Sequence, residues 1–247
     1  MIRAVTYSAS NMSISMAKCI DAAFEFGGVD SMRGYTREEI EKTSFYQSNK
    51  SILDAERGAG YWLWKPYVIQ QQMNECEDGD VLMYIDAGCE LITSVEHITR
   101  SMDDDIFFCS NGHRHVDWCK IDVIREIIRD EYEKGLQFLT SFQQVQASLI
   151  FFKVNNTTRS FVNEWLLYCE IPGFIDDSPS KLPNHPEFAE HRYDQAILTC
   201  LQIKYGYKLH WWPDALWYTS QKYRWPEDKY PAILKHHRKR NHEWETG

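Results

Sequence analysis

Residues 78–90 of the chain read Asp78-Gly79-Asp80-Val81-Leu82-Met83-Tyr84-Ile85-Asp86-Ala87-Gly88-Cys89-Glu90. A short turn precedes five apolar or aromatic residues, and Asp86 follows them abruptly, which predicts a buried strand at 81–85. Ligands of open α/β sheets bind beyond the carboxyl ends of strands, so Asp86 lies where a site is expected. Its carboxylate could hold a divalent cation, and Gly88 would let the backbone approach a ligand closely. A turn that merely closes the strand explains the same residues equally well.

The rest of the chain alternates between apolar strands and helical segments. Further strands are predicted at residues 2–7, 105–109 and 147–153, and helices at 13–26, 65–76, 121–131, 156–169 and 193–204. No repeat or flexible linker divides the chain, although the Pro-rich residues 176–186 indicate a surface loop. This alternation favours a single α/β domain whose mostly parallel sheet is flanked by helices.

The composition excludes several classes of protein. No stretch approaches the roughly 18 apolar residues of a membrane span, and the start lacks the apolar region of a secretory signal. A net charge of −9 argues against nucleic acid as a partner, because phosphate contacts need a basic face. The seven cysteines have no C-x-x-C pair or zinc-like spacing, so we expect reduced thiols in a cytoplasmic chain.

A second polar group precedes the helix at 65–76. Residues 57–66 read Arg-Gly-Ala-Gly-Tyr-Trp-Leu-Trp-Lys-Pro, in which two glycines, two cations and three aromatic rings meet at a helix start. Free backbone N–H groups at that start, with Arg57 and Lys65, could bind a phosphate. Alternatively, Trp62 and Trp64 pack in the core and the cations are solvated.

Two more polar groups come late in the chain. His191-Arg192-Tyr193-Asp194-Gln195 opens an amphipathic helix, where Asp194 would also serve simply as a cap. The tail at 235–242 is basic: a histidine there could ligate a metal and Arg238 could meet a diphosphate, although a frayed terminus has the same composition. G-x-S-x-G, P-loop, H-E-x-x-H and G-x-G-x-x-G motifs are absent, which disfavours hydrolases, P-loop enzymes and Rossmann oxidoreductases.

Taken in order, these residues resemble the "R-G-x-G-Y-W-L-W-K-P … Y-I-D-A-G" run of small GT-A fold glycosyltransferases of large DNA viruses and bacterial polysaccharide clusters. More distantly they resemble retaining galactosyltransferases and glycogenin-like enzymes. The resemblance implies a GT-A fold with a Rossmann-like central sheet. It also implies sugar transfer from a nucleoside diphosphate sugar, first of all a UDP-sugar, to a saccharide or glycoprotein glycan, with Mn²⁺ or Mg²⁺ as cofactor and retention of configuration.

The resemblance also assigns roles to individual residues. Asp86 matches the first Asp of the metal-binding Asp-x-Asp motif, and His236 or His237 matches a late metal-ligating His. Gly88 replaces the second Asp of the motif, so Glu90 or water would have to compensate. Near the reacting sugar it implies three catalytic residues, Asp194, Gln195 and Gln146. For the donor it implies Thr6, Tyr7, Arg57, Lys65, Asp86, Ala87, Gly88 and Arg238.

Tryptophans provide candidates for the acceptor side, because their rings are apolar platforms for sugar faces. We expect this role for Trp118, Trp211, Trp212 and Trp217, with Lys120 and Asp122 beside Trp118 as an acceptor-side or structural element. Two other classes remain open, because fold alone does not fix function. One is a nucleotidyltransferase or nucleotide-sugar hydrolase on the same sheet, and the other is a non-catalytic carbohydrate-binding module.

Overall fold

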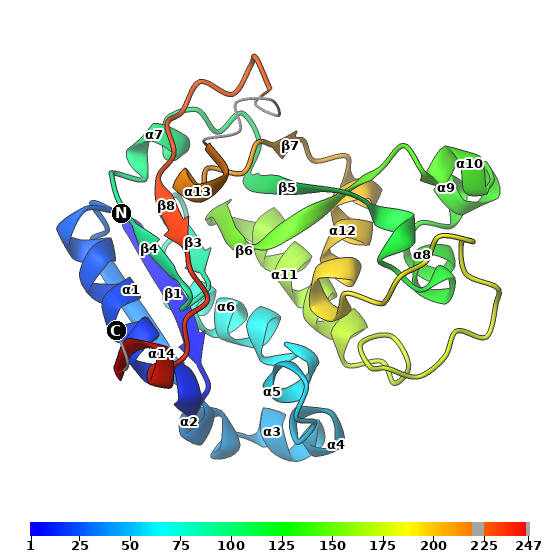
Figure 1. Ribbon diagram of the computed structural model, residues 1–247, viewed down its shortest axis with the longest axis horizontal. Coiled ribbons are helices and arrows are strands. Elements are labelled where there is room, and N and C mark those ends of the chain that lie inside the picture. The colour runs from blue at the N-terminus through cyan, green and yellow to red at the C-terminus, as the bar shows by residue number, and fades with distance from the viewer. Residues whose placement is uncertain (219–224, 246–247) are drawn as a thin grey trace.

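The computed structural model describes residues 1–218 and 225–245 (Figure 1). Its centre is a six-stranded sheet with the order β2-β1-β3-β6-β5-β7. The strands of this sheet are β1 (Ile2–Ser8), β2 (Ser31–Thr36), β3 (Val81–Ile85), β5 (Ile106–Arg114), β6 (Gln143–Lys153) and β7 (Leu209–His210). A second, small sheet pairs β4 (Cys89–Leu91) with β8 (Leu234–His236) in antiparallel register, Cys89 opposite His236.

The central sheet is mostly parallel, as predicted. Strand β1 runs parallel to both β2 and β3, and β7 runs parallel to β5. Strand β6 is the exception, because it lies antiparallel to both of its neighbours, β3 and β5. Its side chains are buried on both faces, as in a parallel strand, so the apolar pattern alone could not indicate its direction.

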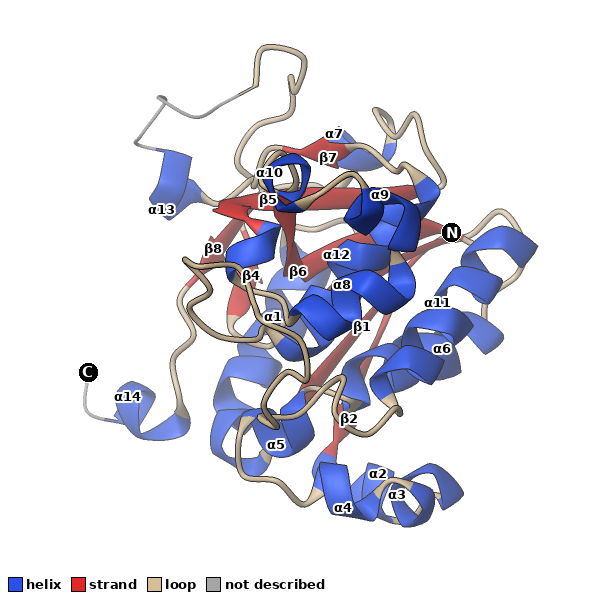
Figure 2. Ribbon diagram, turned by 90° about the vertical axis from the view of Figure 1, so that its right-hand side faces the viewer, coloured by secondary structure: helices blue, strands red, loops and turns tan. Residues whose placement is uncertain are grey.

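The two faces of the sheet bury two separate apolar clusters, because successive side chains of a strand point to opposite faces. Leu82 and Tyr84 of β3 belong to one cluster, and Met83 and Ile85 to the other. The first face is covered by α6 (Trp64–Asn74), α8 (Ile121–Ile127), α11 (Asn156–Cys169) and α12 (Tyr193–Tyr205), with α6 and α11 side by side in Figure 2. The second is covered by α1 (Ser13–Glu25).

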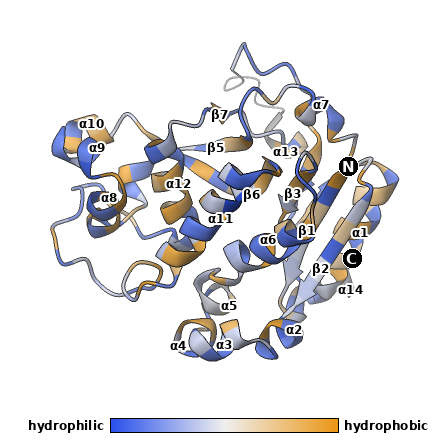
Figure 3. Ribbon diagram, turned by 180° about the vertical axis from the view of Figure 1, so that it is seen from behind, coloured by the Kyte–Doolittle hydropathy of each residue, from blue (hydrophilic) through white to orange (hydrophobic). Residues whose placement is uncertain are grey.

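Helix α12 is the most deeply buried of these helices. Nine of its thirteen residues are buried, and Figure 3 shows it mostly in the hydrophobic colours. It packs on β6 and beside α11, and it ends at Gly206, which adopts the left-handed conformation that favours glycine. The burial fixes the position of its first turn, which carries Asp194 and Gln195.

The predicted long elements are confirmed, with shifted boundaries. The helix predicted at 121–131 is divided into α8 and α9 (Arg129–Glu133), and the strands predicted at 105–109 and 147–153 belong to longer strands. Strands β2, β4, β7 and β8 were not predicted. The remaining short helices are η1 (Ser10–Met12), α2 (Arg37–Glu41), α3 (Ser44–Ser48), α4 (Lys50–Leu53), α5 (Gly58–Tyr61), α7 (Glu96–Thr99), η2 (His115–Asp117), α10 (Leu136–Leu139), α13 (Ala215–Tyr218) and α14 (Asn241–Glu245).

The C-terminal tail is fastened to the first helix, and α14 lies beside α1 in Figure 1. The Asn241 side chain accepts a hydrogen bond from the backbone N–H of Ile14 (3.0 Å) and donates one to Ser13 Oγ (3.0 Å). It therefore satisfies a free donor at the start of α1, whose own N-cap residue makes no side-chain bond. Trp244 Nε1 donates to Ser15 Oγ (2.8 Å), so the last residues of the described chain are held against α1.

None of the helices in the described ranges is both long and apolar enough to span a bilayer. All seven cysteines are unpaired and buried.

Candidate active site

A cleft of about 870 Å³ opens beyond the carboxyl ends of β1 and β3. We call it the charged cleft. The loop after β1, the turn after β3, the segment before α6, the first turn of α12 and the tail all line it. Its charged side chains are five cations and three acids, Arg57, Lys65, Arg192, Arg238 and Arg240 with Glu56, Asp86 and Asp194. In a chain of net charge −9, this local excess of positive charge suits an anionic ligand.

Lys65 lies between the two carboxylates at the bottom of this cleft. Its Nζ is 3.3 Å from Asp86 Oδ1 and 3.5 Å from Asp194 Oδ2, and it donates a hydrogen bond to the Ala147 carbonyl (3.1 Å). The Lys65 and Asp194 side chains are each only 4% exposed, whereas that of Asp86 is 27% exposed. The ion pairs therefore join three distant segments, and Asp86 is the member that is open to a ligand.

Tyr84, which is fully buried, fixes the orientation of Asp86 by donating a hydrogen bond from its hydroxyl to Asp86 Oδ1 (2.5 Å). Burial acts to raise the pKa of Asp86, but the Lys65 ammonium and the bonds from Tyr84 and Ser148 outweigh it and hold the pKa below its usual value. Burial acts to lower the pKa of Lys65, but Asp194 and Asp86 outweigh it and raise that pKa. Both groups are therefore charged at neutral pH.

Asp194 behaves differently. Burial raises the pKa of its carboxyl to about 6, against the opposing effect of Lys65 and with a further contribution from Asp86. Its Oδ2 atom has no hydrogen-bond partner among the described atoms, and the residue lines the charged cleft. Asp194 and Asp86 thus lie on either side of Lys65, and Asp194 takes up a proton at a higher pH than Asp86 does.

Residues 58–62 form a left-handed turn on the wall of the charged cleft. Five successive residues have positive φ, namely Gly58 (60°), Ala59 (51°), Gly60 (101°), Tyr61 (52°) and Trp62 (61°). A Cβ on Gly60 would lie 2.6 Å from Leu53 Cα, so this position requires glycine. The non-glycine residues each cost about 1–2 kcal/mol in this conformation, which packing must offset.

Aromatic stacking provides that packing. Tyr61 and Trp62 each lie 5.3 Å from the ring of Tyr193, which itself has φ 48°, and the Trp64 ring stacks on Tyr7 at 3.9 Å. The first three rings hold the segment before α6 against the first turn of α12, and the stack of Trp64 on Tyr7 holds the start of α6 against β1. Arg57, which is half exposed, lies at the rim of the cleft, where it pairs with Glu190 at 3.3 Å.

Gly88 lines the charged cleft, and it also lies where the tail crosses the turn after β3. The backbone N–H groups of His237 and Arg238 donate to its carbonyl oxygen at 2.9 and 3.1 Å, so the tail crosses directly over it. A Cβ at residue 88 would lie 2.9 Å from Arg238 Cα. Glycine here therefore makes room for the chain's own tail.

The two histidines of the tail point to different places. His236 lines the charged cleft, and burial together with the Arg238 guanidinium lowers its pKa to about 4, so its ring is neutral. Its Nε2 accepts a hydrogen bond from Arg238 Nε (2.9 Å). His237 does not line the cleft: its Nε2 lies 3.3 Å from Glu90 Oε1, and its ring packs edge-on against Trp244. Of the two predicted metal ligands, only His236 shares the cleft with Asp86.

A second cleft of about 840 Å³ adjoins the first, and we call it the tryptophan cleft. Its described lining has three tryptophans, polar side chains of β5 and β6, and no carboxylate: Ser110, Asn111, Gly112, His113, Gln143, Gln146, Arg192, Gln195, Trp211, Trp212, Trp225, His236 and Arg238. Arg192, Gln195, His236 and Arg238 line both clefts. The two spaces therefore share a wall.

The predicted glutamines help to build this wall. Gln195 Oε1 accepts a hydrogen bond from the Ala147 backbone (3.2 Å), and its Nε2 donates to Gln144 Oε1 (2.9 Å). Gln146 Nε2 donates to Ser148 Oγ (3.2 Å) and lines the tryptophan cleft. Gln195 therefore holds the first turn of α12 against β6 at the boundary between the clefts, whereas the bond of Gln146 lies within β6.

The remaining donor candidates divide between cleft and core. Tyr7 and Ala87 line the charged cleft. Thr6 does not: its side chain is fully buried, and its Oγ1 has no partner among the described atoms.

Of the predicted acceptor residues, Trp211 and Trp212 line the tryptophan cleft. Trp118 lies behind its wall, where the Arg192 guanidinium packs 4.4 Å from its ring. The Trp217 side chain lies outside the described part of the structure.

Lys120 and Asp122 line neither cleft, so their contacts favour the structural one of the two roles expected for them. Lys120 is buried and donates to the Gly173 carbonyl (2.8 Å), while Asp122 accepts from the backbone of Lys181 (2.6 Å) and Leu182 (3.0 Å). Both fasten the loop that follows α11, so their role is structural.

Three further residues at this site, Tyr84, Arg192 and Trp225, were not among the predicted site residues. In the sequence, Tyr84 is an ordinary member of an apolar strand. Its hydrogen bond to Asp86 forms where the chain turns after β3. Arg192 stood within a polar group that was noted, but only the fold shows that it faces both clefts.

No protein-family model matches the chain, and no curated protein sequence matches it. Among solved structures, the galactosyltransferase LgtC in complex with donor and acceptor sugar analogues matches with a TM-score of 0.50 and 10% identity, over 96% of this chain and 87% of that chain. An active-site mutant of LgtC gives 0.51 with the same identity and coverage. The apo form of mouse xyloside xylosyltransferase 1 gives 0.47 at 8% identity, over 96% and 97% of the chains. The LgtC matches show that this chain has the predicted GT-A fold.

Proposed function

We propose that the chain is a glycosyltransferase that moves a sugar from a nucleoside diphosphate sugar, first of all a UDP-sugar, to a hydroxyl group of a saccharide or glycan. The observation that carries the proposal is the pair of clefts with a common wall, one charged and one lined by tryptophans. A group-transfer enzyme must hold two substrates against each other, and this arrangement offers one space to each. The fold supports it, since LgtC of the same fold binds donor and acceptor sugar analogues.

The charged cleft fits the donor. Departure of the sugar leaves negative charge on a diphosphate, and preorganised cations lower the energy of that transition state. Three arginines line this cleft, namely Arg57, Arg238 and Arg240. Lys65 already forms ion pairs with Asp86 and Asp194. We therefore assign the diphosphate to the arginines and the positioning of the two carboxylates to Lys65.

A divalent cation, Mn²⁺ or Mg²⁺, fits the same cleft. Asp86 is ionised and partly exposed, and the neutral ring of His236 is in the form that ligates metals. Arg238 competes for His236 Nε2, and Gly88 supplies no carboxylate. Asp86 and His236 are therefore the two ligands that we assign among the described residues, and phosphate oxygens and water would supply the rest. When bound, the ion would neutralise charge on the leaving diphosphate.

The transferred sugar would lie at the common wall. Asp194 and Gln195 project there from the first turn of α12, with Gln146 on the tryptophan side. An ionised Asp194 can stabilise positive charge that develops on the sugar ring, and buried surroundings strengthen that interaction. Trp211 and Trp212 offer apolar faces to the acceptor. Retention of configuration is part of the proposal, and proton NMR of the first product formed tests it.

Nucleotide release from a panel of nucleoside diphosphate sugars, with and without a saccharide acceptor, tests the proposal. We expect release of UDP that depends on acceptor and on Mn²⁺ or Mg²⁺. Equal release without acceptor would instead identify a nucleotide-sugar hydrolase. Saccharide binding with no affinity for any nucleoside diphosphate, measured by titration calorimetry, would identify a carbohydrate-binding module.

A further inference from the structure

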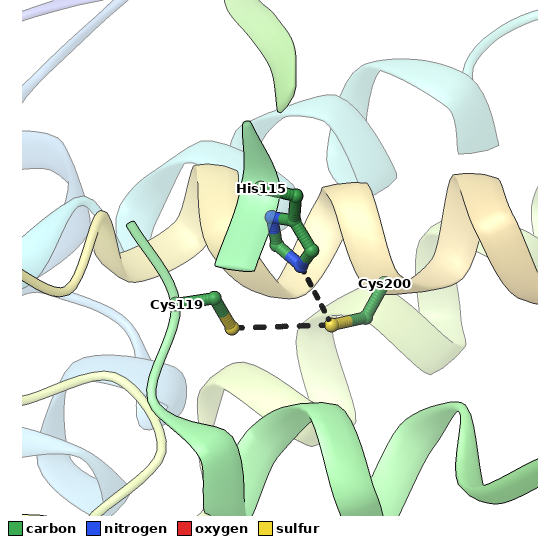
Figure 4. Close-up of side chains that lie close together, drawn as sticks. All are labelled: His115, Cys119 and Cys200. Carbon is green, nitrogen blue, oxygen red and sulfur yellow. Dashed lines mark hydrogen bonds between the residues drawn. The ribbon is translucent and has the colours of Figure 1, made fainter. Parts of the chain in front are cut away.

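We propose that His115, Cys119 and Cys200 form a binding site for one zinc ion in the core, separate from both clefts. Figure 4 shows the three side chains converging from η2, the segment before α8, and the middle of α12. None of them lines the charged cleft or the tryptophan cleft. Within the described ranges, no other group of three or more His, Cys, Asp or Glu side chains is this compact.

The separations suit a single ion. His115 Nε2 lies 3.2 Å from Cys200 Sγ, Cys119 Sγ lies 4.0 Å from Cys200 Sγ, and all three ligand atoms lie within 4.8 Å of one another. Tetrahedral zinc with Zn–S near 2.3 Å and Zn–N near 2.0 Å places such atoms about 3.5–3.8 Å apart. Small rotations of the side chains bring the observed set to these values without moving a helix.

The chemistry of the three side chains selects a thiophilic ion. Thiolate and imidazole ligands suit zinc and copper(I), whereas magnesium and calcium prefer oxygen. All three residues are at most 2% exposed, and an uncompensated buried charge is costly. Two thiolates with a divalent ion form a neutral cluster, whereas a monovalent ion would leave a net charge. Burial and charge together therefore favour zinc.

Zinc binds cysteine as the thiolate, so binding of the ion displaces the protons of Cys119 and Cys200. The other ring nitrogen of His115, Nδ1, has no partner among the described atoms, so the ring is held only through Nε2.

Other buried cysteines of the chain have different surroundings from Cys119 and Cys200. Cys19 and Cys76 are also buried, but their thiols are directed at the carbonyl oxygens of Asp86 and Gln72, and neither belongs to a compact group of three potential ligands among the described residues. Three protein ligands leave the fourth position of zinc to a small exogenous ligand, as in open zinc sites. Cys119 and Cys200 are 81 positions apart in the sequence, which explains why spacing alone predicted no such site.

An ion at this site would fasten two parts of the tryptophan cleft to each other. His115 follows the end of β5, which supplies Asn111 and His113 to that cleft, and Cys200 belongs to the helix that supplies Gln195. Since the ion binds only the folded chain, it stabilises the fold by mass action. We therefore expect zinc to raise the unfolding temperature without being required for nucleotide binding.

The test is elemental analysis of the full chain, expressed with added zinc and purified without chelator. We expect about one zinc per chain in the wild type and less than about 0.1 in the double variant Cys119→Ala/Cys200→Ala, since two of three ligands are lost. Cys169→Ala removes a buried thiol outside the cluster and should keep the ion. Asp86→Ala should also keep it, which separates this site from cation binding in the charged cleft.

Thermal unfolding gives a second readout. Stripping with a chelator should lower the unfolding temperature of the wild type and of Cys169→Ala, and added zinc should restore it, whereas the double variant should not respond. Comparing each variant with and without zinc keeps the test valid even if the alanines themselves destabilise the fold. Absence of metal from the wild type, copper in place of zinc, or full zinc occupancy in the double variant would overturn the proposal.

Discussion

The charged cleft and the tryptophan cleft share a wall, but they are built from different kinds of side chain. The charged cleft depends on a buried set of ion pairs in which Lys65 serves both Asp86 and Asp194. The described lining of the tryptophan cleft has no carboxylate and consists mainly of rings, amides and hydroxyl groups. Removing one member of the first set leaves a buried charge without its partner, which is costly. Removing one ring from the second loses only contact area.

This difference predicts a steep ranking of mutational effects. Substitutions in the charged cleft should lower both kcat and the stability of the fold. The reason is that Asp86 and Asp194 pair with Lys65, which joins three segments of the chain, and also face the proposed donor. Changes in the tryptophan cleft should act mainly on the affinity for acceptor. The predictions below test that ranking, beginning with the largest expected effect.

Asp86→Ala should lower kcat for sugar transfer by about a hundredfold or more, as loss of one key electrostatic group commonly does. The variant should also lose the dependence of nucleotide binding on Mn²⁺, measured by titration calorimetry with and without chelator. Tyr84→Phe is the matched control, because it removes only the hydroxyl that orients Asp86. It should cost less than Asp86→Ala. Wild-type turnover in a folded Asp86→Ala chain would place the donor elsewhere.

Asp194→Asn should reduce kcat by about ten- to a hundredfold while nucleotide affinity stays near the wild-type value, because the charge is needed during transfer. Asn caps a helix about as well as Asp, so a capping role alone predicts unchanged kcat. In the wild type, kcat should fall as pH drops through about 6, where Asp194 takes up a proton. The variant should lack this limb of the pH profile.

The same carboxyl group should also affect stability. Folding raises the pKa of Asp194 from 3.8 to about 6, so the folded state binds its proton more tightly than the unfolded state does. Its stabilising contribution is therefore complete below pH 3.8 and is lost as pH rises through about 6. Unfolding in urea at pH 5 and pH 8 should show a smaller difference for Asp194→Asn than for the wild type. An identical difference in both chains would contradict the raised pKa.

Gly88→Asp would restore the Asp-x-Asp pattern in the sequence, yet we expect it to impair the protein. Its Cβ would lie 2.9 Å from Arg238 Cα, so the tail must move, at a cost of about 1–3 kcal/mol. Gly88→Ala should lower the unfolding temperature by a similar amount, because both variants share the Cβ. If Gly88→Asp instead binds Mn²⁺ and UDP more tightly than Gly88→Ala does, the missing carboxylate matters more than the crossing of the tail.

Local patterns were enough to find part of this site. Asp86 and Lys65 were predicted because a strand end and a helix start are marked by adjacent residues. The pairing of β4 with β8 was not predicted, because it joins residues 89–91 to 234–236, and short strands of this kind have no periodicity of their own. The close approach of the tail that requires glycine at position 88 therefore appears only in the folded structure.

Two other results depended on long-range packing in the same way. Lys120 and Asp122 stand beside Trp118 in the sequence, but the loop after α11 folds over them and occupies their polar atoms. The glycines and aromatic residues at 57–66 indicated a group at a helix start, but not the left-handed turn at 58–62. Its shape depends on the stacking of Tyr61 and Trp62 on Tyr193, some 130 residues later.

The smallest effect expected is that of Trp212→Phe in the tryptophan cleft. Trp212 packs edge-on against His236 and lines the cleft, so the smaller ring loses part of the surface offered to an acceptor. Stacking contributes about 0.5–1.5 kcal/mol, which corresponds to a two- to twelvefold rise in the KM for acceptor. The KM for donor and the kcat at saturating acceptor should be unchanged.

Trp118→Phe is the control, because Trp118 lies behind the wall and lines neither cleft. It should leave the KM for acceptor, the KM for donor and kcat unaltered. Initial rates over a grid of donor and acceptor concentrations measure all of these constants. A fall in kcat for Trp212→Phe as large as that for Asp194→Asn would remove the distinction between the two clefts.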